Sequence, residues 1–150
     1  MKLTDEWFSV LSADEHGQSV FVNGRLRLDE FRLSKKFKIR IELRLPYEAD
    51  CTGMPTVSAM KLIEQIEQPL RKIMEADKLA ILTGNHIGGG KKYWVFYTRT
   101  ERVFQERLNE ALTPFDLLPL EIECGMDADW EEYTDMMELY SAEEDESETD

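Results

Sequence analysis

The chain has 150 residues, 42% of them hydrophobic, which suits one domain with a hydrophobic core. No run of about eighteen apolar residues occurs, so a membrane-spanning helix is excluded. The net charge of −13 arises almost entirely at the C-terminal end, where residues 125–150 hold twelve Asp and Glu and no Lys or Arg follows Arg107. This end argues against direct binding of DNA or RNA, because it would repel their phosphates.

Alternation of apolar and polar residues indicates strands, and apolar residues at every third or fourth position indicate helices. The clearest strand begins at residue 36, because apolar and charged residues alternate from there until Pro46. Along the chain we predict strands at residues 6–13, 18–28 and 36–45, a helix at 57–76, strands at 79–83 and 93–98, a helix from a capping box at 98–101 to residue 112, an edge strand at 117–123 and a helix at 126–140.

The strands at 79–83 and 93–98 are expected to form a central hairpin. The intervening residues include Gly84, Asn85 and three consecutive glycines at 88–90, which predicts a glycine-rich loop. From residue 36 the order is strand, helix, strand, strand, helix, strand, which is typical of a ferredoxin-like α+β sandwich with both helices on one face. Two N-terminal strands would extend its sheet.

Three regions follow from this pattern. Residues 1–125 are predicted to form a single α+β domain, residues 126–140 an acidic amphipathic helix packed on it or appended to it, and residues 141–150 a disordered acidic tail. Basic residues gather between Arg25 and Arg44. Two destinations for the acidic helix therefore stay open, namely the basic face of its own sheet and a partner molecule.

The residues that could carry chemistry lack the spacing that it needs. The glycine triplet followed by Lys91 and Lys92 departs from a phosphate-binding loop, because no Ser or Thr and no helix follow. His16 and His86 are the only histidines, and both fall in predicted turns. Cys51 and Cys124 fit neither a zinc spacing nor a disulfide framework. We expect no catalytic, cofactor-binding or metal-binding residue and no cofactor.

The helix at 126–140 carries the predicted partner-binding site. Its apolar residues are spaced by four, three, four and three positions and are backed by an acidic face. Acidic groups can imitate nucleic-acid phosphates toward a basic enzyme, and aromatic rings supply strong contacts. The apolar residues are Met126, Trp130, Tyr133, Met137 and Tyr140. The predicted partner-binding residues are Trp130, Tyr133, Met137, Tyr140, Asp129, Glu131 and Glu132.

The first hypothesis is therefore a non-catalytic module that binds another protein with a basic surface. The alternative is an enzyme or small-ligand binder with a site at the Gly84–Lys92 loop, using His86, Lys91 and Tyr93. A third hypothesis is a homodimer formed through edge strands or the stripe at 126–140. The acidic N-terminal residues do not resemble a secretory signal, and a cytoplasmic location is expected.

Several segments resemble the bacterial family called domain of unknown function 695. They are Trp7-Phe8, Gly53-Met54-Pro55, Leu62 to Glu67, Trp94 to Thr98 and Asp129 to Tyr133, and the resemblance covers residues 5–137. It implies no catalytic residues, because the family has no established activity. A more distant resemblance in size, acidity and inferred fold is to type B regulators of ribonuclease E, which bind and inhibit that enzyme.

Overall fold

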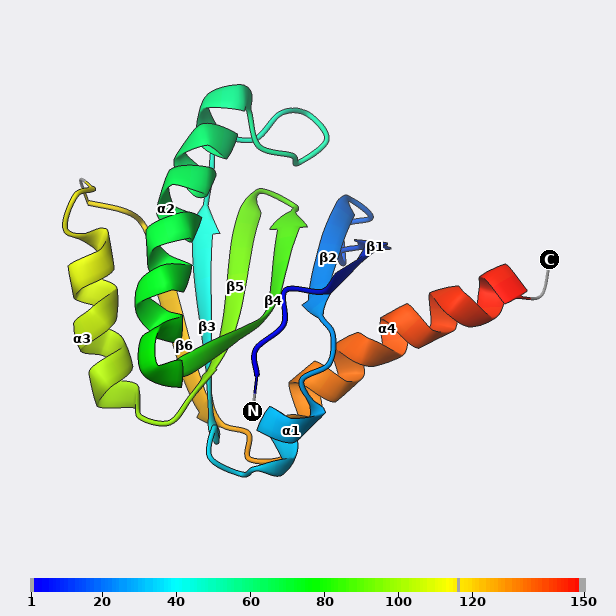
Figure 1. Cartoon of the computed structure of the whole chain (residues 1–150). Helices are drawn as coiled ribbons and strands as arrows, with labels where there is room; N and C mark the ends of the chain where they lie inside the picture. Colours follow the sequence, from blue (N-terminus) through cyan, green and yellow to red (C-terminus); the bar gives the residue numbers. More distant parts are fainter. Residues whose placement is uncertain (1, 116, 149–150) are drawn as a thin grey trace.

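A six-stranded antiparallel sheet forms the centre of the molecule (Figure 1). The computed structural model of the chain describes residues 2–115 and 117–148. The strands are β1 (Trp7–Ala13), β2 (Ser19–Arg25), β3 (Ile39–Pro46), β4 (Ala80–Gly88), β5 (Lys91–Thr98) and β6 (Glu121–Met126). Their order across the sheet is β1-β2-β4-β5-β3-β6, and every neighbouring pair is antiparallel.

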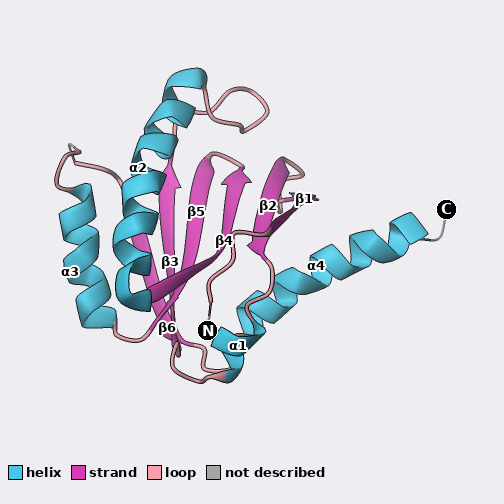
Figure 2. Cartoon of the chain, viewed as in Figure 1, coloured by secondary structure: helices cyan, strands magenta, loops and turns pink. Residues whose placement is uncertain are grey.

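Helices cover parts of both faces of this sheet (Figure 2). Helices α2 (Val57–Glu75) and α3 (Glu101–Leu112) pack on one face, and α1 (Asp29–Leu33) and α4 (Glu131–Glu148) pack on the other. A short 3-10 helix, η1 (Ala76–Lys78), leads from α2 into β4. The predicted α+β class is confirmed, and the two N-terminal strands extend the sheet at one edge.

The first core lies between the sheet and helices α2 and α3. From β3, Ile41 and Leu43 enter this core, and from α2, Ile66 and Leu70 meet them. The charged residues that alternate with these β3 residues lie on the opposite face of the sheet, as the period of two requires. The predicted helix at 57–76 is therefore confirmed, and its apolar stripe faces the sheet. Its first turn is capped by Thr56, whose hydroxyl accepts a hydrogen bond from the Ala59 amide at 3.3 Å.

The second core lies on the other face, under α1 and the start of α4. Alternate residues of β4 and β5, among them Ile81 and Tyr97, enter it together with Phe31 and Trp130. Helix α1 is absent from the predicted elements, because five residues are too few for a helical period to show. It nevertheless matters for this core, since its Phe31 is 1% exposed.

The central hairpin differs from its prediction in the length of its loop. Gly84, Asn85 and His86 belong to β4 and pair with β5, so the predicted loop from Gly84 is wrong and the turn is confined to Gly89 and Gly90. A shift in register between Leu82 and Gly84 lets the strand continue past the glycine. A Cβ at Gly84 would lie 2.8 Å from the Met136 sulfur of α4, so this glycine serves close packing rather than a reversal.

The C-terminal elements are also displaced from their predicted bounds. The edge strand is β6, which begins after Leu120, and Met126 ends that strand instead of starting a helix. Helix α4 begins at Glu131, where both carboxylate oxygens of Asp127 accept amide hydrogen bonds from Glu131 and Glu132 at 2.9 and 3.2 Å. The helix runs to Glu148, whereas we expect disorder from residue 141; residues 149–150 lie outside the described part of the chain.

Candidate functional site

Trp130 anchors the C-terminal segment to the sheet. Its side chain is fully buried, its indole N–H donates to the Phe37 carbonyl at 2.8 Å, and its ring stacks on Tyr97 with centroids 4.5 Å apart. The residue has a φ of 58°, in the left-handed region, at the point where the chain turns into α4. The sequence predicts this ring as a partner contact. The structure corrects that role, because the ring has no surface left for a partner.

Tyr133 makes the second anchor, one helical turn further on. It is 5% exposed, and its hydroxyl donates to the Arg25 carbonyl at 2.5 Å. Burial raises the pKa of Tyr133 to about 12, so the hydroxyl keeps the proton that it donates. The predicted role of Tyr133 in partner binding is therefore corrected as well. Both aromatic residues hold α4 in place.

The remaining predicted site residues lie nearer the surface. Met137 is half-buried against the second core, and the Tyr140 ring stacks on Phe8 with centroids 4.7 Å apart. Asp129, Glu131 and Glu132 are exposed. Asp129 forms an ion pair with Lys35, and the hydrogen bond from this lysine lowers the pKa of the Asp129 carboxyl. The predicted acidic residues are thus the accessible part of the site.

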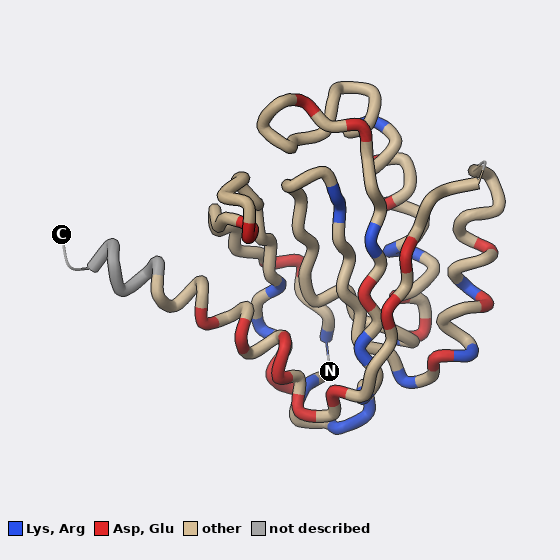
Figure 3. Tube along the Cα trace, turned by 180° about the vertical axis from the view of Figure 1, so that it is seen from behind, with Lys and Arg blue, Asp and Glu red and all other residues tan. Residues whose placement is uncertain are grey.

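We call these exposed carboxylates the α4 ridge, and two more residues complete it. Figure 3 shows acidic residues following one another along the first half of α4. The ridge consists of Asp129, Glu131, Glu132, Asp135 and Glu138, all exposed. Asp135 and Glu138 are missing from the predicted set, although Asp135 follows Glu131 and Glu132 by four and three positions and Glu138 follows Asp135 by three, which places them on the same side of the helix.

A groove of about 250 Å³ separates α4 from the neighbouring end of β6. The charged residues that line it are acidic apart from one arginine, Arg40, whose Nη2 donates to Glu42 at 3.0 Å. The residues that line it are Arg40, Gly125, Met126, Asp127, Glu131, Glu132 and Asp135. The α4 ridge therefore continues into a cleft that ends at the edge strand of the sheet.

The arginines of β3 form their ion pairs with residues outside α4. Arg44 forms ion pairs with Glu42 on its own strand and with Glu121 and Glu123 on β6. Between the basic region and the ridge, one ion pair is found among the described residues, from Lys35 to Asp129. Helix α4 does pack on its own sheet, but it does so through aromatic and methionine side chains, and several of these contacts lie over β1, β2 and β4.

The three candidate groups of the alternative site at Gly84–Lys92 lie on one face of the sheet, since His86 and Gly88 pair in register with Tyr93 and Lys91. Burial lowers the pKa of His86 to about 4, so its imidazole is neutral near pH 7, and its Nε2 has no hydrogen-bond partner within the described structure. The Tyr93 ring lies 6.2 Å from it, and the adjoining cavity of about 40 Å³ holds about one water molecule. Lys91 forms an ion pair with Glu121 at 3.8 Å.

Lys92 lies on the opposite face and is 4% exposed. Its Nζ donates to the Asn85 side-chain oxygen at 2.8 Å and lies 3.4 Å from a Glu67 carboxylate oxygen of α2. Burial lowers the pKa of this lysine. His86 lines the small cavity, but Lys91 and Tyr93 are not among its lining residues, so this cavity does not bring the three candidate groups together. The predicted loop is an ordered hairpin.

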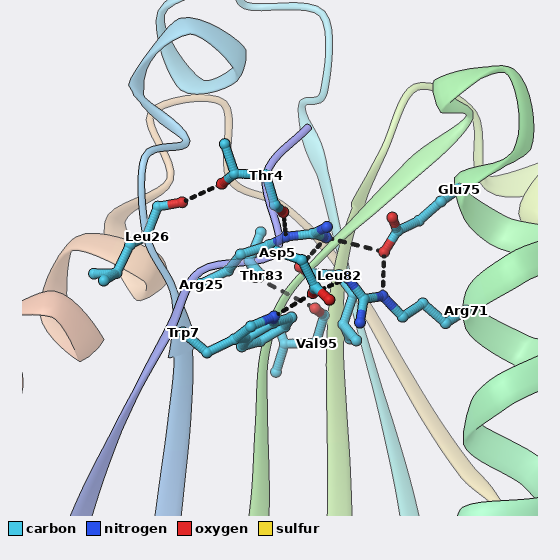
Figure 4. Close-up of polar contacts among 10 residues, drawn as sticks. All are labelled: Thr4, Asp5, Trp7, Arg25, Leu26, Arg71, Glu75, Leu82, Thr83 and Val95. Atoms are coloured by element: carbon cyan, nitrogen blue, oxygen red, sulfur yellow. Dashed lines mark hydrogen bonds and ion pairs between the residues drawn. The ribbon is translucent and has the colours of Figure 1, made fainter. Parts of the chain in front are cut away.

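A buried arginine network that is absent from the predicted features ties the N-terminal segment to α2 (Figure 4). Arg25 is 2% exposed; its Nη1 bonds to Glu75 at 2.9 Å and its Nε donates to the Thr4 carbonyl at 2.7 Å. Arg71 reaches the same Glu75 carboxylate oxygen at 3.0 Å. Its partners lie on the N-terminal segment, α2 and β4, so the network holds these segments together. An arginine at the end of an alternating strand is its only signal in the sequence.

Two further kinds of site can be checked against the described residues. Within them, no group of three or more His, Cys, Asp or Glu side chains is placed to hold a metal ion. None of the helices described here has the length and apolar composition needed to cross a bilayer. Cys51 and Cys124 are both free and exposed.

The model of a protein family of unknown function, DUF695, matches residues 5–138 of the chain. The chain belongs to this family. The predicted membership is thereby confirmed, and the matched region extends from the start of β1 to the middle of α4. No curated protein and no solved structure matches the chain. The resemblance to regulators of ribonuclease E therefore stays a prediction.

Proposed function

We propose that this DUF695 member is a non-catalytic module that binds a basic surface of another protein through the α4 ridge. The supporting observation is that the ridge acids are exposed on a helix whose aromatic residues are locked into the core. Because Trp130 and Tyr133 hold the helix, the carboxylates keep a fixed spacing. A preorganised charged surface loses less conformational entropy on binding than a flexible one.

The charge distribution supports a basic partner. No Lys or Arg follows Arg107, so the ridge has no neutralising residues on its own helix. The electric field of a surface with one sign of charge speeds its diffusional encounter with a surface of opposite charge. This field weakens as salt is added. The type of partner suggested by the sequence, a basic nucleic-acid enzyme, fits this field and belongs to the proposal, as does a cytoplasmic location in a bacterium.

The experiment is a pull-down from cell lysate at low and at high salt with matched charge variants. The ridge variant carries Glu131→Gln, Glu132→Gln, Asp135→Asn and Glu138→Gln. The control variant loses the same number of charges from exposed positions elsewhere, through Glu15→Gln, Glu30→Gln, Glu64→Gln and Glu110→Gln. Truncation at Gly125 is avoided, because it would remove Trp130 and Tyr133 from the second core.

We expect wild type and the control variant to retain the same protein at low salt and to release it at high salt. The ridge variant should fail to retain it. If the ridge variant retains that protein as well as the control does, the α4 ridge is not the binding surface. If binding is indifferent to salt in all three, recognition is not electrostatic and the proposal fails.

The fold assignment can also be taken one step further. We propose that residues from β3 to β6 form a ferredoxin-like unit. In support, the order along the chain is β3-α2-β4-β5-α3-β6, and the corresponding part of the sheet has the order β4-β5-β3-β6. Strands β1 and β2 then extend this unit beside β4, and α4 packs on the face opposite α2 and α3.

A further inference from the structure

We propose that the free edge of β6 pairs with an extended segment of the partner protein, one in which basic and apolar residues alternate. This inference rests on the proposed function and identifies where the basic partner makes its backbone contacts. Strand addition at a sheet edge combines main-chain hydrogen bonds with selection of alternate side chains. Four observations on β6 carry the proposal.

The first observation is the direction of the backbone groups of β6. The Asp127 amide donates to the Lys38 carbonyl at 2.7 Å, and the register pairs Met126 with Ile39. In an antiparallel ladder, hydrogen-bonded and non-hydrogen-bonded pairs alternate. Ile122, Cys124 and Met126 therefore direct both their N–H and C=O groups away from β3. Within the described residues, no other strand pairs with this edge.

The second observation is that the two faces of β6 differ in character. Glu121 and Glu123 pair in register with Arg44 and Glu42 on the charged face of β3, whereas Ile122 pairs with Leu43 on the core side. All six residues of β6 are exposed, including Ile122 at 44% and Met126 at 74%. An added strand would thus meet carboxylates on one face and apolar side chains on the other, which selects basic and apolar residues in alternation.

The third observation separates a foreign strand from a second copy of this chain. Two β6 strands paired about a twofold axis would bring Glu121 and Glu123 of one copy beside the same acids of the other. Like charges placed across neighbouring strands are destabilising. Arg44 and Lys91 form ion pairs with these acids from the inner side of the strand, whereas β6 itself holds no basic residue, so its outer edge favours a basic strand from another protein. The opposite edge strand, β1, contains no charged residue and offers no such selection.

The fourth observation is the acidic groove at the end of β6. Gly125 and Met126 line it together with Asp127 and the ridge residues Glu131 and Glu132. A segment paired along β6 would reach this groove at its end and could place one further basic side chain there. The strand edge and the α4 ridge are therefore parts of one continuous acidic surface.

The test uses a capped synthetic peptide that alternates Lys and Val over the length of β6. Its binding is followed by NMR shifts of backbone amides in the full chain at low salt. We expect the shifts to gather at Ile122, Cys124 and Met126. A peptide with the same composition, but with its lysines and valines in two blocks, should bind several-fold more weakly, because it cannot present one residue type to each face.

Proline variants at the two edges supply the matched control. Cys124→Pro removes one outward N–H from β6 and leaves the ladder to β3 intact, as edge prolines can. It should weaken peptide binding by about tenfold, the effect of one lost hydrogen bond plus steric blocking. Ser9→Pro is the equivalent change on β1, because the bond from the Leu26 amide to the Glu6 carbonyl sets Ser9 outward in the register with β2. It should leave binding unchanged.

A second variant covers the case in which Cys124→Pro does not fold. Glu121→Gln combined with Glu123→Gln keeps the strand backbone and removes the charge that selects lysine, so the alternating peptide should again bind several-fold more weakly. Equal binding by wild type and both β6 variants, shifts centred on β1, or no binding to wild type would each overturn strand addition.

The ridge variant distinguishes this inference from the proposed function. If the lysate protein is lost by the ridge variant but retained by Cys124→Pro, the ridge binds the partner and strand addition is wrong. If Cys124→Pro loses the protein and the ridge variant retains it, pairing at β6 stands and the ridge proposal is wrong.

Discussion

The two faces of the sheet are built on different principles. On the face under α2 and α3, the core is largely aliphatic, with residues such as Leu43, Ile66 and Leu70. On the face under α1 and α4, it is largely aromatic, and Trp130 and Tyr133 each donate a hydrogen bond to a backbone carbonyl. Aliphatic packing tolerates substitutions that conserve volume, whereas a buried hydrogen bond requires a particular geometry. The second face therefore fixes the position of α4, and with it the α4 ridge.

The largest expected effect tests whether the second face is a true core. Trp130→Ala should lower the free energy of unfolding by about 3–5 kcal/mol, because it leaves a cavity and an unpaired Phe37 carbonyl. Urea denaturation would measure it, with Trp94→Ala as the fully buried counterpart on the first face and Glu138→Ala as the surface control. A loss below about 1 kcal/mol for Trp130→Ala would mean that α4 is an appendage.

The next effect sharpens the comparison by testing how closely Phe8 and α4 pack over β2 on the second face. A Cβ at Gly24 would lie 2.2 Å from the Phe8 ring and 3.0 Å from the Met136 methyl carbon of α4. Gly24→Ala should therefore destabilise the protein by about 1–3 kcal/mol through overpacking. Gly125→Ala is the matched control on β6, because nothing lies within 4 Å of its Cβ position. Its effect should stay within about 0.5 kcal/mol in the same denaturation assay.

The smallest effect concerns the polar character of the second face. His86 has a pKa of about 4 in the folded protein, lowered by burial from an ordinary value of 6.5. Its neutral form is the one that folding favours, so this contribution to stability is complete above pH 6.5 and is lost as the pH falls toward 4. Between pH 7 and pH 5 the loss should be about 2 kcal/mol.

Two histidine variants isolate this contribution. The free energies of unfolding of wild type and His86→Gln are measured by urea denaturation across that pH range. Their difference should change by the same amount, since the variant cannot take up the proton. His16→Gln, in the exposed turn between β1 and β2, should keep the pH dependence of wild type. Parallel pH curves for wild type and His86→Gln would show that His86 is hydrated in the native protein.

Much of the fold could be predicted because its elements have strong local periods. The alternation in β3 and the apolar stripe of α2 each depend on residues within one element, so a single segment is enough to identify them. Elements defined by distant contacts were harder. Helix α1 is too short to show a period, and Gly84 resembles a turn residue although it is needed for packing against Met136.

The candidate site likewise has a part that local sequence predicts and a part that depends on distant contacts. Its acidic residues could be found from composition, because charge is a property of the sequence itself. The roles of Trp130 and Tyr133 could not, since an amphipathic stripe facing a partner has the same spacing as one facing the protein's own sheet. Their carbonyl acceptors, on Phe37 and Arg25, are 93 and 108 residues away in sequence.

The sequence by itself determined the α+β class, the family and the concentration of negative charge at the C-terminal end, because these depend on local pattern and composition. Only the tertiary structure decided which surface carries that charge outward. The buried hydrogen bonds of two aromatic residues turn one side of α4 toward the core. The antiparallel register directs the backbone N–H and C=O groups of three β6 residues away from β3. Both outcomes depend on contacts between segments far apart in the chain, and no local pattern specifies them.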